Sequence, residues 1–237
     1  MRRRRSSSCF EDRQPVSARS DVIRELTAKI HSLKLGHPAR VAIDGIDGAG
    51  KTSLADELVE PLASFGRPTI RASIDGFHRS RAERYRQGQD SAEGYYRDSF
   101  DHAALEAALL RPLGPAGSRR YRTAIFDHRA DRPVRQELQT ADSTAVLLFD
   151  GVFLLRPELV HLWDFTIFVK TTFAIALERV VSRDASAFGS GAAARDRYES
   201  RYQPGQRLYL AEADPEQHAD AVVINEEVSR PRIVSPT

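Results

Sequence analysis

The residues best suited to chemistry form one stretch, Gly-Ile-Asp-Gly-Ala-Gly-Lys-Thr at positions 45–52, with the spacing G-x-x-x-x-G-K-[ST] of a phosphate-binding loop. Glycines let the backbone fold back on itself, so that successive N–H groups point inward and bind an anion. Lys51 would bridge the β- and γ-phosphates of a triphosphate, and the Thr52 hydroxyl would hold Mg²⁺. The residues expected to bind the nucleotide are Gly45, Ile46, Asp47, Gly48, Ala49, Gly50, Lys51, Thr52 and Ser53.

Two more acidic residues follow predicted strands. Asp75 comes after residues 69–74, and Asp150 ends the apolar run 144–149. The carboxyl ends of parallel strands share one edge of a sheet, where ligands bind in open α/β folds. Asp150 fits the pattern of a strand-terminal acid that holds Mg²⁺, and Asp75 should face the phosphate site. The alternatives are that Asp75 only caps the next helix and that residues 144–150 signal core alone.

These residues must be positioned by alternating strands and helices. Residues 40–44 form a short buried strand before the loop, and residues 53–59 begin an amphipathic helix after it. A helix between two strands implies a right-handed crossover and a parallel pair. The pattern therefore predicts an α/β fold with a parallel sheet of about five strands flanked by helices. The other expected elements are helices at 21–35, 103–110, 173–183 and 194–210, and strands at 165–169 and 220–224.

Less regular segments lie between these elements. Residues 79–99 are polar and rich in arginine, so we expect a loop with short helical pieces over the active-site edge. Its arginines form either a solvated face or a rim that attracts an anionic substrate. Tyr95 either packs within this loop or stacks on an acceptor. Residues 121–126 and 134–138 suggest a small hairpin, and residues 187–193 suggest a hinge.

Composition limits the classes of protein that fit. Apolar residues make up 41% of the 237 residues and charged residues 29%, and no run of 18 apolar residues predicts a membrane span. The net charge is +2, yet residues 1–20 hold six arginines against two acids, which leaves about −2 for the remainder. We therefore expect neither a nucleic-acid nor a membrane partner. Cys9, the single cysteine, excludes an intrachain disulfide and fits a reducing, cytoplasmic setting.

Several motifs, in order, resemble the uridine kinase / phosphoribulokinase / pantothenate kinase group of P-loop kinases, and the uridine kinase branch is the most similar. The resemblance runs from about residue 41 to residue 224. It implies a kinase domain at 21–225, between a disordered basic tail at 1–20 and a flexible tail at 226–237. The matching segments are 45–52, 73–78, 100–102, 146–151, 168–169, 179–184 and 219–220.

The resemblance also implies roles for individual residues. Asp75 resembles the base or orienter for the acceptor hydroxyl, and Arg183 stands with Arg179 where the family has arginines that close over the phosphates. Asp131 stands where the family has a histidine that contacts the pyrimidine, and its carboxylate could accept from an amino or hydroxyl group. The residues that would contact the acceptor are His78, Tyr95, Asp101, Phe126 and Asp131.

The sequence thus predicts a kinase that uses ATP and Mg²⁺, with Lys51, Asp75 and Arg183 as catalytic residues and Thr52 and Asp150 as metal ligands. The expected partners are ATP and a small-molecule acceptor, first a nucleoside of the uridine or cytidine type. A pantothenate-like acceptor or a sugar phosphate are alternatives. The rival class is a regulatory protein that hydrolyses a nucleoside triphosphate and switches shape. The sequence does not indicate an oligomeric state.

Overall fold

A computed structural model describes residues 19–234 of the chain. Of the expected disordered tail at 1–20, residues 1–18 lie outside this range, and Cys9 is among them. Only Arg19 and Ser20 are described. These two residues begin helix α1 (Arg19–Ser32) instead. The Arg19 guanidinium forms an ion pair with Glu57 at 2.7 Å, so contact with the helix after the phosphate loop holds the first turn of α1 in place.

The main sheet of the described residues has six strands in the order β10-β9-β8-β1-β7-β2. Every neighbouring pair is parallel except β10 and β9. This confirms the predicted α/β fold with a mostly parallel sheet. The strands are β1 (Ala39–Asp44), β2 (Thr69–Ser73), β7 (Val146–Asp150), β8 (Phe165–Lys170), β9 (Ala221–Ile224) and β10 (Arg232–Val234).

The sixth strand differs from the expectation of a flexible tail from residue 226. Arg232–Val234 pair antiparallel with β9, in the register Ile233 to Val223. Ile233 also packs against the buried cluster on one face of the sheet. The short, polar segment gave no strand pattern, and pairing with an available sheet edge orders it.

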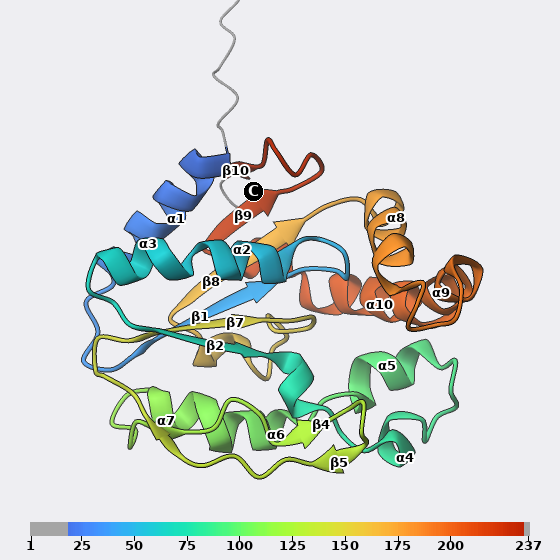
Figure 1. Cartoon of the computed structure of the whole chain (residues 1–237), viewed down its shortest axis with the longest axis horizontal. Helices are drawn as coiled ribbons and strands as arrows, with labels where there is room; N and C mark the ends of the chain where they lie inside the picture. The colour runs from blue at the N-terminus through green and yellow to red at the C-terminus, as the bar shows by residue number, and fades with distance from the viewer. Residues whose placement is uncertain (1–18, 235–237) are drawn as a thin grey trace, which may run out of the picture.

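Helices cover both faces of the sheet (Figure 1). The helices α1, α2 and α3 lie on one face, and the continuous stretch of α6, η2 and α7 lies on the other, beside the short strands β4 and β5. The end of the molecule at which β1 and β8 point carries α8, α9 and α10. The bounds are α2 (Lys51–Glu57), α3 (Val59–Ser64), α6 (His102–Leu105), η2 (Glu106–Leu110), α7 (Arg111–Leu113), η3 (Val160–Leu162), α8 (Phe173–Asp184), α9 (Gly191–Arg197), η4 (Tyr198–Tyr202), α10 (Gln203–Ala213) and α11 (Pro215–His218).

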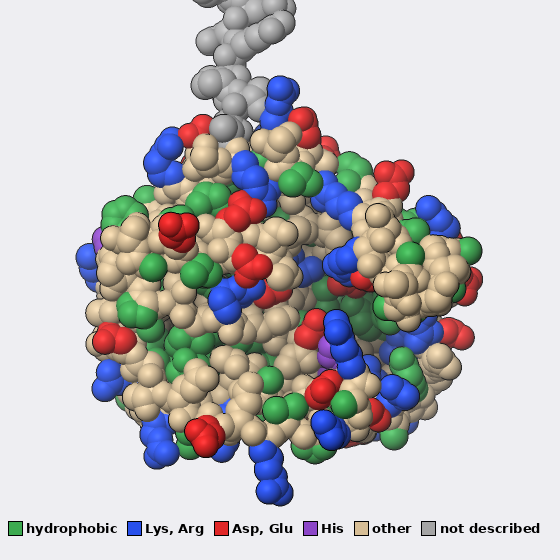
Figure 2. Space-filling model, viewed as in Figure 1, with side chains coloured by type: hydrophobic (Ala, Val, Ile, Leu, Met, Phe, Trp, Pro, Cys, Tyr) green, Lys and Arg blue, Asp and Glu red, His purple; other side chains and the backbone are tan. Residues whose placement is uncertain are grey.

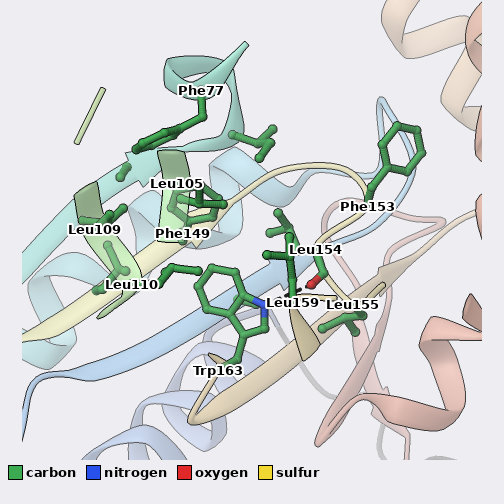
Figure 3. Packing of buried hydrophobic residues seen from close by; sticks show 14 of the residues in the cluster. Phe77, Leu105, Leu109, Leu110, Phe149, Phe153, Leu154, Leu155, Leu159 and Trp163 are labelled. Atoms are coloured by element: carbon green, nitrogen blue, oxygen red, sulfur yellow. Dashed lines mark hydrogen bonds between the residues drawn. The ribbon is translucent and has the colours of Figure 1, made fainter. Parts of the chain in front are cut away.

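Alternating residues of the buried strands supply two separate cores. In β7, Val146 and Leu148 face the cluster under α1 to α3, whereas Leu147 and Phe149 face the other cluster. Successive side chains of a strand point to opposite faces, so one apolar run serves both layers. Figure 3 shows the second cluster, in which Trp163 lies 5.4 Å from Phe149 between ring centroids.

The segment at 79–99 is more ordered than its polarity suggested. It contains α4 (Arg81–Arg84) and α5 (Ala92–Asp98). Tyr95 and Tyr96 of α5 are 6% and 2% exposed, so this segment does contribute to the core. Both rings pack edge-on against Phe153, at 5.1 Å between centroids. These two adjacent aromatic residues join the otherwise polar helix to the core.

The expected hairpin is present, but as two short ladders. The strand β3 (Arg120–Tyr121) pairs with β6 (Gln139–Thr140), and β4 (Phe126–Asp127) pairs with β5 (Arg132–Pro133). The inner ladder lies against η1 (Ile74–Phe77), where the Ile125 amide donates to the Gly76 carbonyl at 2.9 Å. The hairpin therefore reaches the end of β2. Between residues 19 and 234, no helix is long and apolar enough to cross a membrane.

Candidate active site

The phosphate loop turns directly from β1 into α2, as its sequence predicted. Its second and third glycines have φ angles of 76° at Gly48 and 97° at Gly50, in the left-handed region that favours glycine. The space is equally restrictive. A Cβ at Gly48 would lie 2.6 Å from the carbonyl oxygen of Ala176 in α8, and one at Gly50 would lie 2.5 Å from the Asn225 amide nitrogen. The glycine spacing is therefore fixed by packing as well as by the turn.

Lys51 is the first residue of α2 and is 8% exposed. Its ammonium donates a hydrogen bond to the Ile46 carbonyl oxygen at 2.8 Å, across the loop. The positive charge thus lies at the N-terminal end of α2, where the backbone N–H groups also favour an anion. This arrangement suits the phosphates of a nucleotide.

The two expected metal ligands are in direct contact. The Thr52 hydroxyl donates to the Asp150 carboxylate at 2.6 Å, between α2 and the end of β7. A hydroxyl and a carboxylate are the hard oxygen ligands that Mg²⁺ takes from proteins, with water and substrate phosphate completing its shell. The pair therefore fits Mg²⁺. Among residues 19–234, no group of three or more His, Cys, Asp or Glu side chains is arranged to hold a metal ion.

Arg71 is a further residue of this corner that the sequence did not single out. It lies on β2 and donates to the other Asp150 oxygen at 3.0 Å and to Asp56 at 2.9 Å. Its signal in the sequence is its position at the centre of the strand, as a charged residue between Ile70 and Ala72. The guanidinium offsets part of the negative charge on Asp150 and fixes the orientation of its carboxylate.

Asp75 lies in η1, two residues past Ser73, which pairs with Asp150 in the β2–β7 register. Its side chain is 65% exposed, so it faces open space. The protein around it nevertheless displaces water, which raises its pKa, and the charge of Asp150 adds to this. His128, Lys51 and Arg183 act in the opposite direction. The carboxylate thus lies within the electrostatic field of both Asp150 and Lys51.

Three rings form a wall beside Asp75. His78 stacks on His128 at 4.6 Å between centroids and meets Phe100 edge-on at 4.5 Å. Burial first, then the neighbouring His128, lowers the pKa of His78 to about 3, so this ring is neutral at physiological pH. Figure 2 shows the surface hollowed between the α8–α9 end and the part below it, with Lys or Arg, acidic and His side chains around the hollow. His78 was expected at this place, whereas His128 was not.

Two of the expected acceptor contacts are held by the protein itself. An oxygen of Asp101 accepts from the Ala104 amide at 2.9 Å and caps α6. An oxygen of Asp131 accepts from the Arg81 amide at 2.7 Å and lies 3.5 Å from the Arg84 guanidinium. These bonds give both carboxylates a local structural role. Phe126 is half-buried in β4, next to η1.

Tyr95 lies in the interior and not on the acceptor wall. Its ring packs against Phe153 and Tyr202, and its hydroxyl donates to Asp47 of the phosphate loop at 3.2 Å. The sequence left packing and stacking open, and the structure shows packing. Tyr95 is buried because α10 covers α5.

The two arginines of α8 have different partners. Arg179 donates to the carbonyl oxygens of Gly48, Asn225 and Glu226 at 2.8–3.2 Å, so it joins the phosphate loop to the segment after β9. Arg183 pairs with Asp184 at 2.7 Å and stays 61% exposed. Both therefore lie on the side of the site formed by α8. Ser53, also expected at the nucleotide, is exposed on α2.

The residue before the loop, Asp44, is another feature that sequence reasoning did not use. It is fully buried and accepts from the Gly45 amide at 2.6 Å, from the Leu155 amide at 3.1 Å and from the Tyr209 hydroxyl. Burial raises its pKa to about 6, against the hydrogen bond from Tyr209 and the other donors. Its signal was an acid ending an otherwise apolar strand, immediately before a glycine.

Comparison with known proteins agrees with this geometry. The family model described as Phosphoribulokinase / Uridine kinase family matches residues 41–223. The chain belongs to this family. A uridine kinase of Leuconostoc citreum is 26% identical over 153 residues, which is 64% of this chain and 71% of that protein. A pantothenate kinase of Rhodopseudomonas palustris is 28% identical over 159 residues, which is 62% of this chain and 49% of that protein.

Solved structures show the same fold. The structure described as "a Possible Uridine Kinase" from Bacillus stearothermophilus aligns with a TM-score of 0.67 and 24% identity, covering 86% of this chain and 97% of that one. D-glycerate 3-kinase from Cryptococcus neoformans aligns with a TM-score of 0.65 and 13% identity, covering 90% and 99%. The fold of this family member is therefore that of the P-loop kinases, and the relatives differ in the acceptor that their names give.

Proposed function

We propose that the protein is an ATP-dependent kinase that transfers the γ-phosphoryl group to a hydroxyl group of a small molecule, with a nucleoside of the uridine or cytidine type as the leading acceptor. The observation that carries this proposal is the placement of Asp75. Asp75 lies just past the end of β2, and its side chain faces open space. The neighbouring strand β7 ends in Asp150, which accepts a hydrogen bond from Thr52. A pure nucleotide switch does not need an exposed carboxylate at this position.

The reaction follows from this placement. The acceptor hydroxyl oxygen attacks the γ-phosphorus, the bond from that phosphorus to the β–γ bridging oxygen breaks, and ADP leaves. The hydroxyl proton passes to the Asp75 carboxylate. Its raised pKa makes Asp75 a better proton acceptor than an ordinary aspartate. Because the transition state is loose and anionic, positioning and charge neutralisation supply most of the acceleration.

The nucleotide side supplies this neutralisation. The inward N–H groups of residues 45–52, the Lys51 ammonium and the α8 arginines Arg179 and Arg183 would surround the phosphates. Mg²⁺ held by Thr52 and Asp150 would neutralise phosphate charge. Arg183 would have to leave its ion pair with Asp184 to reach the phosphates.

The acceptor is the finer part of the proposal. The stacked rings of His78 and His128, with Phe100 buried against His78, place aromatic side chains beside Asp75 that suit a flat group such as a nucleobase. The uridine kinase relative supports this class. Asp131 does not, because the Arg81 amide already occupies one of its oxygens. Pantothenate-like acceptors and sugar phosphates therefore remain the second candidates, and the pantothenate kinase relative favours testing them.

A screen of acceptors scored by ADP release tests the proposal. Uridine and cytidine come first, then pantothenate and sugar phosphates, each with Mg²⁺ and ATP. We expect turnover that requires an acceptor and yields one phosphorylated product. Turnover that ignores every acceptor and rises only with an added protein would replace the kinase by a nucleotide-dependent regulator.

A further inference from the structure

The helical segment formed by η4 and α10 lies between the phosphate loop and the polar segment 84–91. It makes buried contacts with both. The phosphate-loop contacts involve Gln206 and Tyr209, and the contacts with 84–91 involve Arg201. None of these residues is required for the chemistry described above.

On the nucleotide side, the contact is with two acids that each precede a glycine, Asp44 before Gly45 and Asp47 before Gly48. The Gln206 amide donates to Asp47 at 2.7 Å, and Gln206 is 2% exposed. Three residues further along the same helix face, the Tyr209 hydroxyl donates to Asp44. Asp47 belongs to the segment 45–52 whose N–H groups must point at phosphate, and Asp44 immediately precedes it. A side chain that fixes Asp47 therefore fixes the peptide groups on either side of it.

On the other side, Arg201 is 2% exposed, and its guanidinium donates hydrogen bonds to four backbone carbonyl groups of the segment 84–91. It donates to the carbonyl oxygens of Gln89 at 2.7 Å, Ser91 at 3.1 Å, and Gly88 and Arg84 at 3.2 Å. Its partner Arg84 reaches the His128 carbonyl at 3.4 Å, so this segment connects directly to the ring wall.

The two sides are rigidly joined. Gly205 lies against α5 so closely that a Cβ there would meet the Tyr95 ring at 2.7 Å and the Ala92 carbonyl at 2.9 Å. Tyr95 donates its hydroxyl to the same Asp47 oxygen as Gln206 does. A movement of the loop at Asp47 must therefore displace α10, α5 or both, because closely packed interiors transmit displacement.

We propose that Gln206 is a positioning residue of the phosphate loop, and that with Arg201 it couples nucleotide binding to the acceptor-side segment 84–91. This inference deepens the proposed function, because it takes residues 84–91 as the border of the acceptor site. Gln206 acts through Asp47 and does not touch the phosphates itself.

The test uses the full chain, Mg²⁺ and AMP-PNP, a nonhydrolysable analogue of ATP. In Gln206→Met the volume is kept and the amide is lost, so we expect the Kd for AMP-PNP to rise roughly tenfold, as for a hydrogen bond to a charged group. Tyr95→Phe removes the other donor to Asp47 and should weaken binding in the same direction. Gln217→Met, the same change at an exposed glutamine of α11, is the matched control and should leave the Kd unchanged.

Hydrogen exchange measures the coupling. In the wild type, AMP-PNP should slow amide exchange at residues 84–91, and in Gln206→Met this protection should be lost even at saturating AMP-PNP. A lowered melting temperature with unchanged Kd and unchanged protection would show a merely structural role and overturn the inference. Neither readout needs phosphoryl transfer. A protein that passes both but turns over no acceptor would contradict the proposed function alone.

Discussion

The nucleotide side and the acceptor side of this site are built in different ways. On the nucleotide side, backbone geometry positions the functional groups. Gly48 and Gly50 are left-handed, α2 begins at Lys51, and strands end at Asp44 and Asp150. Each of these positions is closely packed or buried. Phosphate is the same in every nucleotide, so one rigid backbone arrangement is sufficient.

The acceptor side is built from side chains on short, irregular elements. His78 follows η1, His128 lies in the hairpin with two-residue strands, and Phe100 precedes α6. Their contacts join segments that are distant in sequence. Small changes in these segments would change which acceptor fits without disturbing the phosphate loop. The following experiments test this division, from the largest expected effect to the smallest.

Asp75→Asn should lower kcat by roughly 10²- to 10⁴-fold, because an amide cannot accept the hydroxyl proton. The Kd for ATP should stay close to that of the wild type, since Asp75 lies on the acceptor side. Steady-state kinetics and calorimetric titration measure the two quantities. Asp196→Asn, exposed on α9, is the control. Near-normal turnover in Asp75→Asn would remove the base from the mechanism.

Lys51→Ala should lower kcat/KM for ATP by roughly 10²- to 10³-fold, the range for loss of one preorganised group that stabilises transition-state charge. Acceptor binding should change little. The melting temperature should be nearly kept, because the lysine bonds only to a loop carbonyl. Lys34→Ala, at an exposed lysine after α1, serves as the control. Equal loss of ATP and acceptor binding would contradict the division between the two sides.

Thr52→Ala should raise the Mg²⁺ concentration needed for half-maximal turnover about tenfold, since one oxygen ligand is lost while Asp150 remains. A magnesium titration at fixed ATP measures this shift. Thr69→Ala, at the opposite end of the sheet, should leave the titration unchanged. Unaltered Mg²⁺ dependence in Thr52→Ala would show that the hydroxyl is not a metal ligand.

His78→Gln should change the response to acid and have the smallest effect at neutral pH. In the wild type the folded-state pKa is lowered to about 3, below the usual 6.5, so the unfolded chain binds the proton first as the pH falls. The stability contributed by neutral His78 is therefore present above pH 6.5 and is lost progressively toward pH 3. At pH 4.5 the loss amounts to about 2–3 kcal/mol.

Urea unfolding of His78→Gln and the wild type at pH 7 and pH 4.5 measures this difference. The variant should lose less of its free energy of unfolding on acidification. His161→Gln, at an exposed histidine, is the control and should follow the wild type. If the free energy of unfolding changed equally in His78→Gln and the wild type between pH 7 and pH 4.5, His78 would not be buried as the structure shows.

The fold and the nucleotide side were largely predictable from the sequence. The spacing of residues 45–52 fixed the strand, loop and helix, and the acid after residues 144–149 marked the partner of Thr52. The acceptor side was predictable only in part. The sequence singled out His78 but not His128, which stacks on it, and it left open whether Tyr95 packs or stacks on an acceptor, where the structure shows packing. Ring stacking across a hairpin leaves no fixed spacing along the chain.

The sequence by itself therefore determined which segment forms the phosphate loop, because that loop needs local backbone conformations that only certain residues adopt at a fixed spacing. Only the tertiary structure decided that Arg71 supports Asp150, that Asp131 is occupied by the Arg81 amide, and that Gln206 supports Asp47. Each of these contacts joins residues brought together by packing of separate elements, and a hydrogen bond between residues 50 or more positions apart has no local signature.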